Sequence, residues 1–348
     1  MTRTPATDTL SSASARLLNV APMLDWTDRH CRYFHRLLTQ KTVLYTEMVT
    51  TGAIIHGKQD FLAFHPAEQP VVLQLGGSDP AALAQAVELA AARGYREVNL
   101  NVGCPSDRVQ NGSFGACLMA EPELVSRCVA AMRQAADIKV SVKTRLGIDE
   151  LDSDEFLDKF IDTVAAGGCH DFTLHARKAW LKGLSPKQNR EIPPLQYERV
   201  YRAKARRPEL HITLNGGVTS WAQVAEHLQY VDGVMIGREA YQNPWLLTAA
   251  DAMVTNAELP AVATEIDWAG RREVVEQMIA YTEAHIAAGG RAWHVARHML
   301  GLYQQLPGAK RWRQYLSQQG PRADTAGALF DGALAAVEAF QDILEPIE

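Results

Sequence analysis

The sequence has few cysteines, and their spacing argues against two common architectures. The 348 residues contain five cysteines, an odd number, and no CxxC pair. A disulfide framework or a cysteine-ligated zinc site is therefore not expected. The cysteine usage instead predicts a protein of the reducing cytoplasm. The histidines near the amino terminus lack an HExxH spacing or a carboxylate partner, so no metal site is predicted there. These histidines are His30, His35, His56 and His65.

Other signals are missing as well. No apolar run approaches the length of a membrane span, so no membrane partner is expected. Residues 1–17 are rich in Ser, Thr and Ala without the apolar core of a secretory signal, and we interpret them as a disordered tail. There is no GxxxxGK[ST] or GxGxxG phosphate loop and no GxSxG elbow. The net charge of −5 predicts no bulk attraction to nucleic acid, so any such contact must use local basic patches.

What is present is a regular alternation of short apolar runs and helical patterns. Eight such runs are dense in Val, Ile and Leu, as parallel strands covered on both sides are. They span residues 18–23, 43–48, 71–76, 97–103, 138–145, 171–176, 211–217 and 233–238. Helical patterns lie between them, over residues 79–94, 121–135, 153–166, 195–205 and 220–229. The order predicts an α/β fold, a (β/α)8 TIM barrel, with a doubly wound sheet as the alternative.

The pattern changes near residue 267. Four amphipathic segments, 271–287, 291–305, 309–318 and 326–343, predict a small all-α domain after the barrel. The boundary is placed in the polar stretch around Pro260. The predicted organisation is a tail at 1–17, a barrel at 18–258 and a helical domain at 265–348, and we expect a monomer.

The most informative stretch runs from Val98 to Cys117. Its first residues alternate apolar and polar as a strand does, and Cys104 follows the strand end, before a proline and a Gly-rich loop. Functional groups of such barrels sit at the carboxyl ends of strands. A thiol there suggests chemistry, although a buried structural cysteine explains the stretch equally well.

Most of the other strand ends are also polar or Gly-rich. The glycines after the last two strands, with Arg238, suit a phosphate group. Because no dinucleotide loop is present, a mononucleotide is expected. Lys143, Gln74 and His175 suit the ring of a flavin, since a cation beside the ring stabilises its anionic reduced form. Each of these polar residues could instead be an ordinary satisfied polar group.

Two basic segments stand out in this acidic chain. Residues 173–190 and 284–323 contain no Asp or Glu. The second also carries Trp293, Tyr303 and Trp312 among its arginines and lysines. Basic and aromatic side chains together suit a nucleic-acid backbone and its unstacked bases. A solvated helix face, or contacts with acidic parts of the same chain, is the alternative.

These residues together resemble the tRNA-dihydrouridine synthases, over essentially the whole chain after residue 17. The motifs that carry the resemblance are Ala-Pro-Met at 21–23, Gln-Leu-Gly-Gly at 74–77, Asn-Leu-Asn-Val-Gly-Cys-Pro-Ser at 99–106, Val-Lys-Thr-Arg at 142–145, His-Ala-Arg at 175–177, Asn-Gly-Gly at 215–217 and Gly-Arg at 237–238. The Cys-Pro-Ser form and the loop at 175–190 are similar to the A-type branch, which acts at tRNA positions 20 and 20a.

The resemblance implies an oxidoreductase that reduces the C5–C6 double bond of uridine in the tRNA D-loop. It implies bound FMN, NADPH as hydride donor, and a helical domain that recruits tRNA. Cys104 would be the proton donor, with hydride added at C6 and the proton at C5. FMN would be held by Ala21, Pro22, Met23, Gln74, Lys143, His175, Asn215, Gly216, Gly217, Gly237 and Arg238. The tRNA would contact Asn101, Lys187 and Arg190, to which charge alone adds Lys310 and Arg313.

Two other functions remain open at this point. An FMN-dependent dehydrogenase of a free small molecule, such as dihydroorotate, would explain the barrel and the flavin residues but not the acid-free helical segment. A non-catalytic RNA-binding protein would explain the basic segments but not Lys143 beside two phosphate-type motifs.

Overall fold

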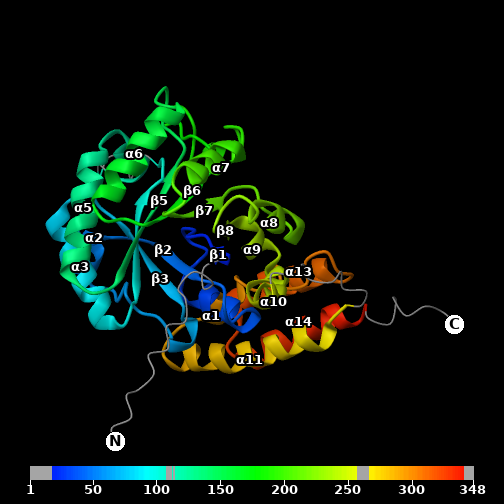
Figure 1. Cartoon of the computed structure of the whole chain (residues 1–348). Helices are drawn as coiled ribbons and strands as arrows, with labels where there is room; N and C mark the ends of the chain where they lie inside the picture. Colours follow the sequence, from blue (N-terminus) through cyan, green and yellow to red (C-terminus); the bar gives the residue numbers. More distant parts are fainter. Residues whose placement is uncertain (1–17, 107–111, 113, 257–265, 341–348) are drawn as a thin grey trace, which may run out of the picture.

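A computed structural model of the chain describes residues 18–106, 112, 114–256 and 266–340. The predicted tail at 1–17 and most of the predicted boundary around Pro260 lie outside the described residues. Figure 1 shows a barrel with helices around it and a group of carboxyl-terminal helices on one side.

Eight parallel strands form one sheet in the order β1-β8-β7-β6-β5-β4-β3-β2. The sheet closes between its first and last strands, because the Val20 amide donates to the Val43 carbonyl (2.9 Å) and the Val43 amide to the Leu18 carbonyl (3.0 Å). The predicted (β/α)8 barrel is confirmed. Its strands are β1 (Leu18–Val20), β2 (Leu44–Thr50), β3 (Val71–Gly76), β4 (Glu97–Val102), β5 (Lys139–Arg145), β6 (Asp171–His175), β7 (His211–Asn215) and β8 (Gly233–Ile236).

The main crossover helices begin and end where local signals place them. Asp79 caps α3 (Pro80–Arg93) by accepting from the Ala82 amide at 2.7 Å, and Gly94 ends it in the left-handed region (φ 101°). The others are α2 (Thr51–His56), α5 (Pro122–Ala135), α6 (Asp154–Ala166), α7 (Tyr197–Arg206), α8 (Trp221–His227), α9 (Arg238–Gln242) and α10 (Ala250–Asn256).

Helix α1 (Arg29–Leu38) was not expected from the sequence, because its buried face contains charged residues. Arg32 is buried and forms an ion pair with buried Glu68 (Nε–Oε2 2.6 Å). Arg36 is also buried and donates to the backbone carbonyls of Thr39, Thr42 and Glu68. Its apolar residues Cys31, Phe34 and Leu38 do recur at helical spacing, but basic residues lie between them and are buried as well.

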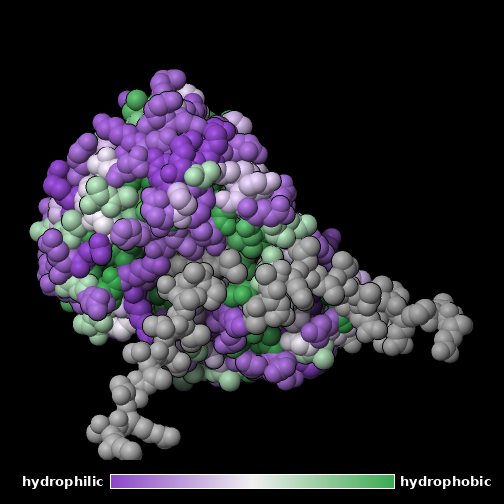
Figure 2. Space-filling view, in the orientation of Figure 1, coloured by the Kyte–Doolittle hydropathy of each residue, from purple (hydrophilic) through white to green (hydrophobic). Residues whose placement is uncertain are grey.

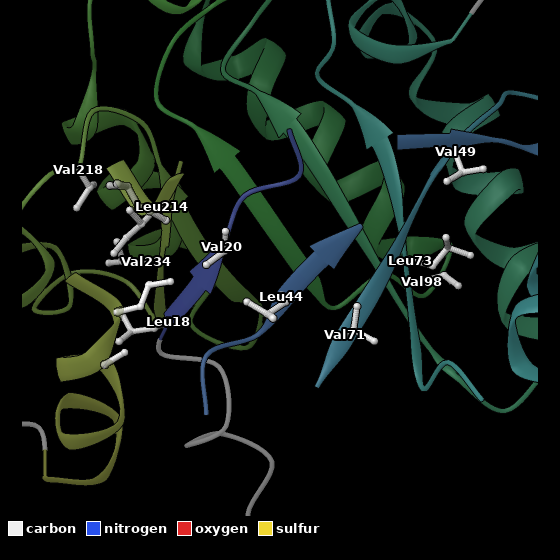
Figure 3. Close-up of a cluster of buried hydrophobic side chains, with 14 of the residues drawn as sticks. Leu18, Val20, Leu44, Val49, Val71, Leu73, Val98, Leu214, Val218 and Val234 are labelled. Carbon is white, nitrogen blue, oxygen red and sulfur yellow. The ribbon is translucent and has the colours of Figure 1, made fainter. Parts of the chain in front are cut away.

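The strands separate an apolar exterior from a more polar interior. Leu18, Val20, Leu44 and Val98 belong to the large core between sheet and helices, part of which Figure 3 shows. Successive strand residues point to opposite faces, so the alternate positions face the barrel axis. There only a small apolar cluster is found, and polar side chains such as Asn99 are buried.

The carboxyl-terminal helices are α11 (Trp268–Ala287), α12 (Ala292–Ala296), α13 (Ala309–Gln319) and α14 (Ala326–Glu338). The prediction of one helix over 291–305 is wrong, since it ends at Ala296 and turns follow to Gly308. Trp312 holds this irregular stretch: it is fully buried and its Nε1 donates to the Met299 carbonyl at 2.8 Å. The last helix ends at Glu338, before the predicted residue 343. No helix within the described ranges is both long and apolar enough to cross a membrane.

Helices α1 and α11 join the barrel to these later helices, and Figure 1 shows them next to each other. Asp28 caps α1 with Oδ1, which accepts from the amides of His30 (2.9 Å) and Cys31 (3.0 Å). Its Oδ2 accepts from Arg297 (2.7 Å) and His298 (3.0 Å), beyond α12. Tyr33 of α1 stacks on Tyr281 of α11 (ring centroids 4.0 Å apart). We call the Asp28 contacts the Asp28 clasp.

Several basic residues are used in ion pairs between neighbouring helices of the barrel. Arg199 pairs with Asp154 at 2.8 Å and Arg207 with Asp158 at 2.8 Å, and both pairs join α7 to α6. Figure 2 shows a strongly hydrophilic surface at the end of the barrel that carries these two helices. Positive charge in this sequence is therefore partly structural.

Candidate active site at the barrel mouth

Cys104 lies in a turn that Asn101 holds at the carboxyl end of β4. The Asn101 Oδ1 accepts from the backbone amides of Gly103 and Cys104, each at 3.0 Å. Cys104 itself is partly exposed, and its Sγ lies 3.5 Å from the Ser106 Oγ. The thiol is thus at the mouth rather than sealed in the core, in contrast to the buried Cys31, Cys128 and Cys169. The alternative of a merely structural cysteine loses its main support.

A group of cations surrounds this thiol. Burial lowers the pKa of Lys143 to about 7, with Arg145 lowering it further and Cys104 opposing the shift. The pKa of Arg145 falls to about 10 by burial, again opposed by Cys104. Burial and the nearby Arg238 lower the pKa of Arg190, whereas Cys104 acts to raise that pKa. The surroundings of the Cys104 turn are therefore positively charged.

The ends of β5, β6 and β7 meet on the same side of the mouth. The Lys143 Nζ donates to the Asn215 Oδ1 at 3.0 Å, and the Asn215 Nδ2 donates to the Met235 carbonyl at 2.9 Å. Burial and the nearby Arg145 and Lys143 hold the pKa of His175 well below its usual range. His175 is consequently neutral at physiological pH and can donate or accept a hydrogen bond.

The glycines after β7 leave space that a side chain would fill. Gly216 has a φ of 128°, and a Cβ there would lie 3.0 Å from the His175 ring. Gly217 has a φ of 71°, and a Cβ there would lie 2.6 Å from Leu195. The positive φ and the close neighbours together mean that both positions suit glycine and no larger residue. The Tyr197 hydroxyl fixes the turn by donating to the Gly216 carbonyl at 2.8 Å.

The first and last strands complete the mouth. The Ala21 amide donates to the Ile236 carbonyl at 2.8 Å, which places the Ala21–Met23 segment beside the end of β8. A Cβ on Gly237 would be 3.9 Å from that of Ala21. Pro22 and Met23 follow Ala21 and are partly exposed. Arg238 is half-exposed and pairs with Glu191 at 2.9 Å, a partner that the sequence did not suggest.

Gln74 of β3 is almost completely buried and uses both ends of its amide. The Nε2 donates to the Asn99 Oδ1 at 2.9 Å, and the Oε1 accepts from the Asn101 Nδ2 at 2.9 Å. Gln74 and Asn101 are therefore brought together, as their place at neighbouring strand ends predicts. Each amide still has one N–H for a ligand.

The long loop after β6 is anchored to the Cys104 turn by Arg145. The Arg145 Nε donates to the Gly103 carbonyl at 3.0 Å, and the Arg145 Nη1 donates to the Asn189 carbonyl of the loop at 2.9 Å. Lys187 and Arg190, on either side of buried Asn189, are exposed. The loop thus presents both predicted RNA contacts from a fixed base.

Two of the three aromatic residues named in the second basic segment are not available for stacking on bases, whereas Trp293 is partly exposed. Tyr303 and Trp312 are fully buried and pack against each other (ring centroids 4.8 Å apart). The interpretation of these two rings as exposed platforms is therefore wrong. Lys310 is exposed, whereas Arg313 is partly buried and donates to the Gln304 Oε1 at 2.6 Å. Their predicted contact with tRNA stays a prediction.

Sequence reasoning missed the residues that support this mouth from below. Asn99, Ser141 and Glu97 continue the hydrogen-bonded series from Gln74 into the barrel. Their signal was present as polar residues at alternate positions of otherwise apolar strands. Arg145 was noticed only as a strand end. Groups of three or more potential metal ligands are absent from the described part of the chain.

Comparison with known proteins shows the family to which the chain belongs. Residues 19–341 match the family described as "Dihydrouridine synthase (Dus)". The chain belongs to the dihydrouridine synthase family. The sequence-based assignment is confirmed, and with it an oxidoreductase family that acts on a CH–CH bond.

Curated members of the family are similar over nearly their whole length. The chain is 60% identical to the "tRNA-dihydrouridine(20/20a) synthase" of Shewanella oneidensis, covering 87% of this chain and 88% of that protein. It is 58% identical to the protein of that name from Vibrio vulnificus, covering 94% and 98%. It is 57% identical to that from Yersinia pestis, covering 92% and 91%.

A solved structure described as a "2-Naphthoyl-CoA Reductase-2-Naphthoyl-CoA complex" shares the fold alone. Its TM-score is 0.51 at 10% sequence identity, and the match covers 67% of this chain and 49% of that one.

Dihydrouridine synthases depend on a flavin, and the residues at the mouth fit such a group. Gly217 is exposed after its left-handed turn, and Gly237 has open space beside its backbone. Lys143, partly buried, offers a cation whose charged form gains from an electron-rich neighbour. Gln74 and Asn215 offer amide groups. This donor set matches both the phosphate and the ring edge of a flavin mononucleotide.

Proposed function

We propose that this chain reduces the C5–C6 double bond of uridine in tRNA to 5,6-dihydrouridine, with FMN as its bound cofactor and NADPH as the reductant. One observation carries the proposal: a chain 60% identical to a tRNA-dihydrouridine synthase over most of its length holds a partly exposed thiol at the barrel mouth. The relatives' names also support uridines 20 and 20a of tRNA as the targets.

The barrel, residues 18–258, would hold the cofactor. Asn215, Gly216, Gly217, Gly237 and Arg238 would bind its phosphate and ribityl chain. Gln74, Lys143, His175 and the segment 21–23 would border the ring. When bound and reduced, FMN supplies the hydride for C6 of the uracil.

Cys104 would deliver the proton to C5. Its Sγ–H is the acid, and the uracil gains a hydrogen at C5 as the thiol becomes a thiolate. Lys143, Arg145 and Arg190 lie near this sulfur and make its surroundings positively charged. Asn101 holds the turn through two backbone amides and so keeps the sulfur in place.

The RNA would be bound by cations at the rim of the mouth and in the helical domain. A uridine in a folded tRNA must leave its stack before it can enter. Lys187 and Arg190 on the anchored loop, with Lys310 and Arg313 in the helical domain at 265–348, would contact the tRNA, and Asn101 would contact the target nucleotide. Such contacts to phosphate position the RNA without reading its sequence.

The test is a comparison of the wild-type protein with Cys104→Ala. The purified wild type should be yellow, oxidise NADPH and form dihydrouridine in unmodified tRNA, counted by mass spectrometry of its nucleosides. The variant should keep its flavin absorbance and its NADPH oxidation, while dihydrouridine formation falls by about 10²-fold or more, the contribution typical of a general acid. Unchanged product formation would remove Cys104 from this role, and a colourless wild type without activity would refute the function.

A further inference from the structure

A continuous series of hydrogen bonds runs down the inside of the barrel from the Cys104 turn. Below Asn101 and Gln74, the Asn99 Nδ2 donates to the Ser141 Oγ at 3.0 Å. The Ser141 hydroxyl donates to the Glu97 Oε1 at 2.8 Å. We call Asn99, Ser141 and Glu97 the polar stem.

The stem is buried and occupies adjoining strands. Asn99 is 0% exposed, Ser141 3% and Glu97 9%. Asn99 of β4 is in register with Gln74 of β3 and with Ser141 of β5. Glu97 and Asn101 are four residues apart on β4. At a strand rise of ~3.3 Å per residue, the far end of the stem at Glu97 therefore lies about 13 Å from Asn101 along the barrel. None of the three stem residues contacts Cys104.

The groups at the two ends of the series fix the same donor-to-acceptor direction for the hydrogen bonds between them. At the top, backbone amides of Gly103 and Cys104 can only donate, so the Asn101 oxygen must face them. At the bottom, the Ser141 hydroxyl donates its one proton to the Glu97 Oε1, so its oxygen can only accept from Asn99. Every amide between them is then oriented without conflict. A reversed Asn99 would set N–H against N–H at Gln74.

We propose that the polar stem positions the active site: it fixes the direction of the Gln74 and Asn101 amides and, through Asn101, the turn that carries Cys104. The stem residues are positioning residues, since they act through other side chains. The proposal deepens the proposed function, because Gln74 and Asn101 are the residues expected to face FMN and the target nucleotide. It also has a consequence that needs neither of these ligands, namely the mobility of the Cys104 turn.

The first measurement is the alkylation rate of Cys104 by iodoacetamide, in protein without added tRNA or NADPH, followed by peptide mass spectrometry. Ser141→Ala removes the acceptor of Asn99 and should raise the Cys104 rate about tenfold, which is the population change that one hydrogen bond is worth. Cys117, the other partly exposed cysteine, is the internal control and should not change. Ser141→Thr keeps the hydroxyl and should restore the wild-type rate.

A second measurement separates positioning from loss of structure. If Ser141 acts through Asn101, then Ser141→Ala should have little further effect in an Asn101→Ala background, whereas independent effects add. With tRNA and NADPH present, Ser141→Ala should lower kcat for dihydrouridine about tenfold and leave KM for tRNA near its wild-type value.

Defined results overturn the proposal. An unchanged ratio of Cys104 to Cys117 labelling, or additive effects with Asn101→Ala, would refute it even if the wild type makes dihydrouridine. If the wild type makes none but the labelling changes as expected, only the proposed function fails. Should Ser141→Ala not fold, Glu97→Leu asks the same question, with Glu97→Gln as its control because the amide oxygen still accepts from Ser141.

Discussion

Removing the Asp28 carboxylate should cost this protein more stability than removing a carboxylate in a similar but exposed position. In Asp28→Ala, helix α1 loses its N-cap, which costs about 1 kcal/mol. The variant also loses two charge-assisted hydrogen bonds, from Arg297 and from His298. Because His298 is fully buried while the Arg297 side chain is 36% exposed, we assign most of the further cost, about 1–3 kcal/mol, to His298.

The expected total for Asp28→Ala is thus about 2–4 kcal/mol in the free energy of unfolding, measured by urea titration. Asp28→Asn keeps a good cap and should lose about half of this. Asp60 is the matched control, because it also accepts from an arginine (Arg93, 2.7 Å) and from a backbone amide but is 49% exposed. Asp60→Ala should cost less than about 1 kcal/mol. Equal losses at Asp28 and Asp60 would refute the reasoning.

The same clasp predicts an acid dependence. Burial raises the pKa of Asp28, but the hydrogen bond from His298 and the surrounding charges outweigh it and hold the pKa well below the ordinary value of 3.8. Stability gained from a depressed carboxyl pKa is present above the unfolded value and is lost as the pH falls through the folded one. The gap between wild type and Asp28→Asn should therefore be constant from pH 7 to 5 and narrow below pH ~4. A gap that widens in acid would contradict this assignment.

Two further predictions concern ligands. Binding of reduced FMN at pH 8 in the absence of oxygen should take up close to one proton in the wild type and none in Lys143→Met, because burial lowers the pKa of Lys143 to about 7 and the anionic reduced ring beside it raises that pKa again. Calorimetry in two buffers of different ionisation enthalpy measures this uptake, and equal uptake in both proteins would contradict the prediction. Replacing Lys187 and Arg190 by Ala should weaken tRNA binding and reduce the slope of log K against log [salt] by about one to two, whereas Lys159→Ala, an exposed cation on α6, should not.

Much of the barrel could be predicted because its signals are local. The bounds of strands β3 and β4 are as predicted, apart from one residue at the end of β4. Both strands are rich in Val and Leu, and Pro or Gly ends the neighbouring segments. Helix α1 escaped because its buried positions include arginines whose partners, such as Glu68, are distant in sequence. The false helix after Ala296 has a similar cause: Trp312 packs from a later helix and fixes turns where local propensity favours helix.

The site divides in the same way. The carboxyl end of each strand could be located, so Cys104, Lys143 and Asn215 were expected near one another. Which side chain each would contact could not be inferred, because that depends on strand register and on depth within the barrel. Asn99 illustrates the difference: it was seen as a polar residue in a strand, but its bonds to Gln74 and Ser141 cross to two other strands.

The Asp28 clasp has a consequence for how the protein would bind RNA. Cations on the loop after β6 and cations near α13 belong to parts of the chain that are far apart in sequence, and the clasp keeps α1 and the segment after α12 in one arrangement. We expect the protein to offer the same contour before and after association, at little entropic cost to itself. The deformation needed to bring a uridine to the thiol would then fall on the nucleic acid, and tRNAs with a loosely folded D-loop should be the faster substrates.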